Sequence, residues 1–144
     1  MAILWASTSY HLGDHPGIFQ DACYVGHVLR LPFRKAWIDP EASGVVLRVH
    51  TRDVETWADR LGHKVSINET EVGRLKDAAD ALGGTEVFEF SVTRPELEDA
   101  LAGGDHFTLS IELDLGTTGP RLSDDFVVTR IESDGSFAAA LGWT

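Results

Sequence analysis

Residues 107–115 read Phe-Thr-Leu-Ser-Ile-Glu-Leu-Asp-Leu, so apolar and polar side chains alternate along the whole stretch. Because successive side chains of a β-strand point to opposite faces, this alternation predicts a strand with one buried and one wet face. A wet face is typical of antiparallel sheets, since parallel sheets are covered on both sides. The stretch therefore favours an antiparallel sheet that is open to water on one side.

A second strand pair is indicated at the C-terminal end of the sequence. Residues 126–133 and 136–144 flank Asp134–Gly135, a dipeptide that favours the type I′ turn of a two-residue hairpin. Such a turn would place Phe126 opposite Trp143 and the other large side chains on the same face. We therefore predict a C-terminal hairpin that turns at Asp134–Gly135.

Earlier parts of the chain contain further runs rich in β-branched or alternating residues, and Gly26 interrupts one of them as a bend or bulge. These runs predict strands at 2–12, 18–33, 45–50, 64–67 and 85–92.

Three segments combine a capping residue, an apolar stripe at helical spacing and a glycine stop. The second of them begins with Asn68 and has Glu71 three residues later, as in a capping box. The third has Pro95 in its first turn, where proline is tolerated. The predicted helices begin after Thr51 or Asp53, after Asn68 and after Thr93, and they end before Gly62, Gly83 and Gly103.

The expected fold class is therefore α+β. We expect a single mixed or mainly antiparallel sheet of about six to eight strands, with about three short helices mostly on one face. The chain has 144 residues and shows no repeat or linker, so residues 1–144 are expected to form a single domain.

Acidic residues dominate the charge: 23 Asp and Glu against 12 Lys and Arg give a net charge of −11. A chain of this charge repels the phosphates of nucleic acids and anionic membranes, so neither is expected as a direct partner. The same charge attracts a protein with a basic surface.

The location of the protein is expected to be cytoplasmic. The single cysteine, Cys23, has no partner for an internal disulfide, as is usual in a reducing compartment. The first residues lack the basic and long apolar regions of a secretory signal. No apolar run approaches the length of about 20 residues that a membrane span requires.

Metal-ligating side chains are densest near the N-terminus, where imidazole, carboxylate and thiolate groups occur close together. These are the groups that bind zinc. Their spacing matches no specific motif, because Gly13 and Pro16 interrupt a helix and the glutamate of HExxH is missing. No cofactor is expected, with a divalent metal such as zinc as the alternative. The candidate ligands are His11, Asp14, His15, Cys23 and His27.

A partner-binding surface is suggested by carboxylates on the wet faces of the strands. Glu112 and Asp114 share one face of their strand, and Glu89 is expected to share it from an earlier strand. Trp37 follows two basic residues in a predicted loop, and tryptophan beside arginine is common in interfaces.

These features favour a binding protein over an enzyme, because the sequence has no nucleophile elbow, phosphate-binding loop or other catalytic motif. We expect a small acidic module, a monomer or small homo-oligomer, that inhibits a basic protein partner. Immunity proteins, antitoxins and phage-encoded anti-defence proteins are of this type. The alternatives are a small metal-dependent enzyme or metal-binding protein that uses the N-terminal cluster, and a structural or assembly subunit.

Overall fold

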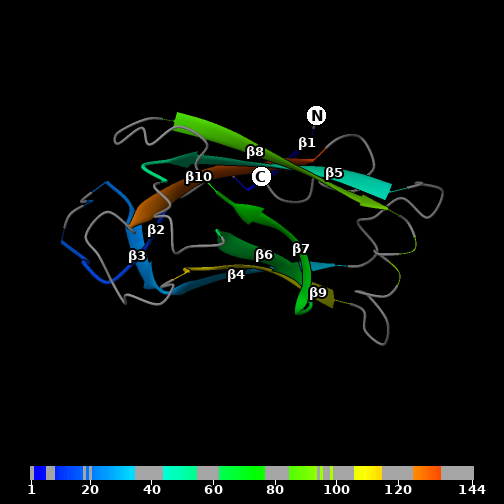
Figure 1. The fold of residues 1–144 in the computed structure, drawn as a ribbon, viewed down its shortest axis with the longest axis horizontal. Coiled ribbons are helices and arrows are strands. Elements are labelled where there is room, and N and C mark those ends of the chain that lie inside the picture. Colours follow the sequence, from blue (N-terminus) through cyan, green and yellow to red (C-terminus); the bar gives the residue numbers. More distant parts are fainter. Residues whose placement is uncertain are drawn as a thin grey trace.

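The computed structural model describes residues 2–5, 9–17, 19, 21–34, 44–54, 62–76, 85–93, 95, 98, 106–114 and 125–133. These residues form β-strands that build two stacked sheets (Figure 1). The strands are β1 (Ala2–Trp5), β2 (Tyr10–Leu12), β3 (Cys23–Gly26), β4 (Val28–Arg34), β5 (Gly44–Arg52), β6 (His63–Ile67), β7 (Thr70–Leu75), β8 (Thr85–Thr93), β9 (His106–Glu112) and β10 (Phe126–Ser133).

The larger sheet has six strands in the order β3-β2-β10-β5-β8, and β1 also pairs with β10. β1 and β2 lie along the same edge of β10, where Ala2 pairs with Ser133 and Leu12 pairs with Phe126. β5 occupies the other edge of β10. All these pairs are antiparallel except β2 with β3, which is parallel.

The smaller sheet has four antiparallel strands in the order β4-β9-β6-β7. It lies below the larger sheet in Figure 1, and β7 rises from it toward β8. Gly73 of β7 makes this approach possible. A Cβ atom at Gly73 would lie 2.1 Å from the ring of Phe90 on β8, so the ring packs directly on the glycine backbone.

The hydrophobic core fills the space between the sheets, as in a β-sandwich. Strand alternation supplies it: Leu47 and Val49 of β5 are buried, whereas Arg48 and His50 between them are only partly buried. The smaller sheet contributes in the same way, with Leu109 and Ile111 of β9 at most 2% exposed. The predicted half-buried strand is thereby confirmed over β9, which ends at Glu112, whereas Leu115 lies outside the described residues.

The expectation of one α+β sheet is wrong. The described residues form two sheets, and no helix is complete among them. The chain has enough alternating strands for two layers, and the layers bury their apolar faces against each other. Helices are not required for that burial.

The second predicted helix is a clear correction. Asn68 and Glu69 have φ values of 47° and 71°, so they form a tight two-residue turn rather than a helix start. The residues that follow form β7 and pair with β6. Asn68 is held to β9 instead, where its side-chain oxygen accepts a hydrogen bond from the Thr108 amide at 2.8 Å.

The other two helix predictions fall largely outside the described residues. Thr51 lies within β5, and Thr93 is the last residue of β8, two positions before Pro95. Residues 55–61 lie outside the described part of the chain. Of the third segment only Pro95 and Glu98 are described, and both have helical backbone.

The predicted C-terminal hairpin is incompatible with the pairing of β10. Its strand 126–133 is confirmed, but both edges of that strand are already occupied, by β5 on one side and by β1 and β2 on the other. A hairpin partner therefore has no edge of β10 to pair with. The turn at Asp134–Gly135 and residues 136–144 lie outside the described residues.

Candidate functional site

A loop between β2 and β3 covers part of the outer face of the larger sheet. We call it the covering loop; its described residues are 13–17, 19, 21 and 22. His11 and Val127 alternate with core residues and so point outward, yet both are fully buried. The Phe19 ring lies edge-on to the His11 ring at 4.9 Å. The loop therefore creates a small second core outside the sandwich.

The carboxylate of Asp125 lies at the centre of this second core and is fully buried. The His11 ring donates to it from Nε2 at 2.6 Å, and the His15 ring from Nδ1 at 3.1 Å. The backbone amides of Asp14 and His15 donate at 3.2 and 3.1 Å. Because a carboxylate only accepts hydrogen bonds, all four groups act as donors, and together they satisfy a buried charge.

Gly13 makes room for this carboxylate. A Cβ atom there would lie 2.0 Å from Cγ of Asp125, and the φ of 149° is one that residues with a side chain rarely adopt. The carbonyl of Gly13 accepts a hydrogen bond from the Tyr24 hydroxyl at 2.6 Å. Its amide donates to the Gly26 carbonyl at 2.9 Å, which connects the covering loop to β3.

The structure brings three of the five candidate metal ligands together around Asp125. His11 and His15 donate to its carboxylate through their rings, and Asp14 donates through its backbone amide. The Asp14 side chain is paired with Nε2 of His27 instead. Cys23 is exposed and lies beside Tyr10, whereas its neighbour Tyr24 is the residue beside His11. Among the described residues no group of three or more His, Cys, Asp or Glu is arranged to hold a metal ion.

His11 and Asp125 have the hydrogen bond of a catalytic His–Asp pair, but the imidazole is sealed. The rings of Phe19 and Tyr24 lie edge-on to it, and it is fully buried. A general base must reach the proton that it removes, and His11 cannot do so in this conformation. Among the histidines of the N-terminal cluster, His15 and His27 are the exposed ones, at 40% and 44%. The pair therefore acts as an anchor for the covering loop.

Two buried atoms in this region have no hydrogen-bond partner within the described part of the chain: Nδ1 of His11 and Oδ2 of Asp14. Buried polar atoms without a partner are rare and destabilising. The four hydrogen bonds to Asp125 therefore have to outweigh the cost of burying these two atoms.

A second anchor holds the far end of the covering loop. Arg52 of β5 donates to the Asp21 carboxylate at 2.7 Å, and its guanidinium lies 5.4 Å from the centre of the Phe19 ring. The hydrogen bond from Arg52 holds the pKa of the Asp21 carboxyl below its usual value, and the positive charge of Arg52 adds to this effect. Desolvation acts in the opposite direction and is outweighed.

The predicted partner-binding carboxylates do not share one face. Glu89 lies on the outer face of the larger sheet and pairs with Arg48 at 2.8 Å. Glu112 lies on the smaller sheet and pairs with Lys64 at 3.4 Å. Asp114 accepts a hydrogen bond from the Gly62 amide at 3.1 Å. Trp37 lies outside the described residues.

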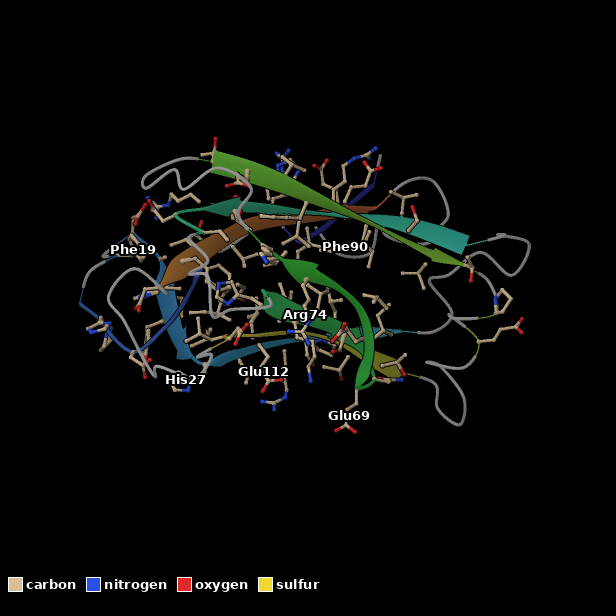
Figure 2. All side chains as sticks on the ribbon, viewed as in Figure 1. Phe19, His27, Glu69, Arg74, Phe90 and Glu112 are labelled. Carbon is tan, nitrogen blue, oxygen red and sulfur yellow. The ribbon has the colours of Figure 1, made fainter. Side chains whose placement is uncertain are left out.

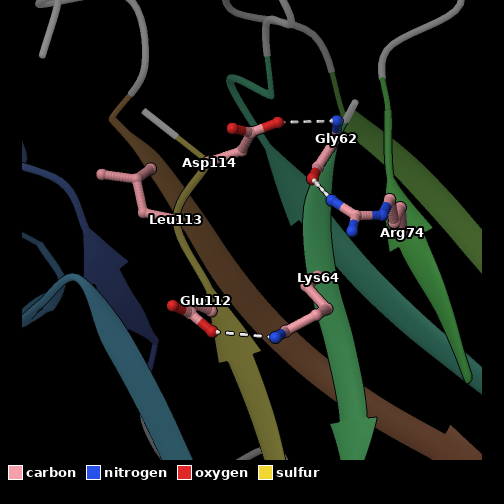
Figure 3. Close-up of a pocket in the computed structure, with 6 residues that line it drawn as sticks. All are labelled: Gly62, Lys64, Arg74, Glu112, Leu113 and Asp114. Carbon is pink, nitrogen blue, oxygen red and sulfur yellow. Dashed lines mark hydrogen bonds and ion pairs between the residues drawn. The ribbon is translucent and has the colours of Figure 1, made fainter. Parts of the chain in front are cut away.

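Glu112 and Asp114 do share a shallow depression of about 150 Å³ on the smaller sheet (Figure 3). Arg74 projects over it and donates to the Gly62 carbonyl at 3.0 Å. Its other lining residues are Gly62, Lys64 and Leu113. Each charged group of the depression has a partner: Lys64 pairs with Glu112, and Arg74 and Asp114 bond to the backbone of Gly62.

Asp125 and Gly13 are the residues that sequence reasoning missed. Asp125 precedes an apolar strand, and nothing in the local pattern distinguishes it from the other acidic residues in loops. Its importance depends on the pairing of β10 with β2, which places His11 beside it. The one available signal was a glycine between two histidines, at a point where a polar group approaches the backbone.

No helix among the described residues has the length and apolar character needed to cross a membrane. Neither a protein-family model nor a curated protein matches the chain.

Proposed function

We propose that this chain is a small acidic binding module that inhibits a protein partner with a basic surface. The observation that carries this proposal is the net charge of −11 on a chain of 144 residues. A charge of this size steers oppositely charged partners toward the protein and speeds their association.

The arrangement of cations in the sandwich supports the proposal. Five basic side chains on the described strands each lie within ion-pair distance of a carboxylate. These five side chains therefore do not form a basic patch that would offset the excess of acidic residues. They are Arg48, Arg52, Lys64, Arg74 and Arg130.

Inhibition follows from the chemistry of the partner. A basic surface that binds nucleic acid is built to hold phosphates, and carboxylates offer a similar charge to the same arginines and lysines. An acidic protein that occupies that surface competes with the nucleic acid. Immunity proteins, antitoxins and phage-encoded anti-defence proteins act in this general way, and we place this chain among such inhibitors.

The test is recovery of the protein from its own source in one affinity step at low salt, followed by native mass spectrometry. We expect a stoichiometric basic protein that dissociates at a few hundred millimolar salt, because screening shortens the reach of charge interactions to a few ångströms.

A chain recovered without any protein partner at low salt would contradict the proposal. A partner that stays bound in high salt through an apolar interface would also contradict it, because the charge would then not be the cause of binding.

A further inference from the structure

Five strands have an edge with which no other described strand pairs: β1, β3 and β8 in the larger sheet, and β4 and β7 in the smaller. An edge strand carries backbone N–H and C=O groups that are free to pair with another chain. Proteins usually protect such edges with proline, with bulges, with charged side chains or by keeping the strand short.

Four of the five edges carry such protection. β4 has the exposed Pro32 at its centre, and proline offers no backbone N–H. β7 is bulged at Val72, because Val65 pairs with Gly73 while Ser66 pairs with Glu71.

β3 is protected in two ways. It has only four residues, and its register with β2 shifts between His11 and Leu12. β1 is protected in the same two ways, since it has four residues and its register with β10 shifts between Ile3 and Trp5. Short, irregular strands of this kind are poor templates for another chain.

β8 lacks these protections over most of its length. Its nine residues pair with β5 without any register shift, and they include no proline and no lysine. No strand among the described residues pairs with its other edge. Glu86 is an inward-facing charge, but it lies at the start of the strand. On the outer face the apolar side chain of Val87 is 53% exposed.

A second copy of this chain is a poor occupant for the β8 edge. Each copy carries a charge of −11, and two copies joined edge to edge would repel each other. A basic segment is attracted by the same charge.

The side chains of β8 define the pattern of such a segment. One set, including Phe88 and Phe90, packs at the rim of the core, and the other set, including Val87 and Glu89, faces outward. Figure 2 shows Phe90 on the inner side of β8. A strand added beside β8 would place apolar side chains next to the phenylalanines and basic ones next to Glu89.

We propose that β8 is the docking edge, and that it binds an extended basic segment of the partner protein as an additional strand. The basic character of the occupant rests on the proposed function. The strand-addition geometry rests only on the contrast between β8 and the four protected edges.

The first experiment uses a capped peptide of about eight alternating valine and lysine residues, titrated at low salt into the full chain and followed by NMR. Its control is a peptide of equal charge in which consecutive central backbone nitrogens carry a methyl group. The central part of this peptide has no N–H groups to donate to β8, whichever of the peptide's two edges faces the strand. We expect shift changes centred on 85–93, and binding of the methylated peptide weaker by at least about tenfold, since strand addition depends on main-chain hydrogen bonds. Equal binding of both peptides, or shift changes centred on β1, β3, β4 or β7, would overturn the proposal.

The second experiment compares two charge-matched double variants. Val87→Lys with Ser91→Lys places two lysines on the outer face of β8. Glu69→Gln with Thr70→Lys changes the net charge equally at the β6–β7 turn, where Glu69 projects away from the sandwich (Figure 2). After their unfolding midpoints show that both are folded, we expect peptide affinity to fall about tenfold more in the β8 variant. Equal losses in both variants would overturn the proposal.

The mass and the amide exchange of the free chain show whether something other than a basic partner already covers the β8 edge. We expect a mass of one chain, 15.7 kDa, and rapidly exchanging amides on the outer edge of β8. A dimer with protected β8 amides would show that a second copy fills the edge. A monomer with the same protection would show that the chain covers its own edge. Either result overturns the proposal.

The two proposals fail separately. A basic partner from the source that binds the β8 variant and the wild type equally would leave the proposed function intact and overturn the docking edge. Peptide addition at β8 without any basic partner in the source would support the docking edge and overturn the proposed function.

Discussion

Single residues decide whether the covering loop can lie on the sheet. The loop approaches β10 closely enough for the Asp14 and His15 amides to reach the buried carboxylate of Asp125. This approach depends on the missing side chain of Gly13, because any Cβ there would overlap the carboxylate. Gly13 and Asp125 are 112 positions apart in the sequence. Only the fold therefore shows that the Asp125 carboxylate occupies the space that a side chain at position 13 would fill.

We predict that Gly13→Ala destabilises the protein by about 2 kcal/mol or more, because it combines an unfavourable backbone conformation with a steric overlap. Gly17→Ala is the matched control, since a Cβ at Gly17 meets nothing within 4 Å. It should change stability by less than about 0.5 kcal/mol. The measurement is urea unfolding of both variants, and equal midpoints would show that the space around Gly13 is not needed.

The ion pair of Asp21 with Arg52 makes the far end of the loop sensitive to acid. Because the folded pKa of Asp21 is below its unfolded value, the pair stabilises the fold above the unfolded pKa. This contribution is lost as the pH falls through the folded pKa. We predict that Arg52→Gln raises the pKa of Asp21 toward its usual value. The check is an NMR titration of the side-chain carboxyl carbon, with Arg74→Gln as the control. An unchanged titration in Arg52→Gln would show that Arg52 is not the cause of the shift.

The sequence of the β6–β7 hairpin fits the pattern of a helix as well as that of a bulged strand. Val72 and Leu75 are three residues apart, which suggests the stripe of a helix. In the structure the bulge at Val72 shifts the strand alternation by one residue. Leu75 is thereby buried and Val72 packs against the core from the same strand. A bulge thus reproduces the spacing that a helix would give.

We predict that Glu69→Gly stabilises the protein by about 1 kcal/mol, because Glu69 has a φ of 71° in the turn and glycine adopts this conformation without strain. Thr70→Gly is the control within β7, where glycine should cost about 1 kcal/mol. Both variants are compared by thermal and urea unfolding. If the segment were a helix start, neither glycine would stabilise it, so a destabilised Glu69→Gly would contradict the hairpin.

At the scale of the whole molecule, the two halves of the chain are held together through β10. This late strand lies in the middle of the larger sheet, between β5 and the N-terminal strands β1 and β2. Pairs such as Ala2 with Ser133 join residues from near both ends of the sequence. Repulsion among the surplus negative charges of the chain opposes its compaction.

We predict that salt stabilises the protein at neutral pH. Screening reduces the repulsion of a chain with a charge of −11, and this gain should exceed the loss from weakened surface ion pairs, which contribute little individually. Raising sodium chloride from about 0.02 to 0.5 M should increase the free energy of unfolding in urea by on the order of 1 kcal/mol. Potassium chloride should act equally, which distinguishes screening from binding of a particular cation. A decrease in stability would show that the ion pairs outweigh the net repulsion.

The sequence by itself determined the charge and many of the strands, although not β7. Alternation predicted the half-buried strand at residues 107–115, and β-branched runs predicted β5, β6 and β8, because strand burial is encoded locally with a period of two. It also placed His11, Asp14 and His15 close together, simply because they are neighbours in the chain.

Only the tertiary structure decided how many sheets form, which face each carboxylate occupies and what the histidines do. Glu89 and Glu112 were expected to share a face and lie on different sheets, since strand order is fixed by long-range pairing that local patterns do not record. Asp125 became the centre of the N-terminal cluster because β10 pairs with β2 across more than a hundred residues. The site around Asp125 depends on hydrogen bonds and steric fit between segments that are far apart in the chain. Such interactions cannot be recognised from local sequence patterns.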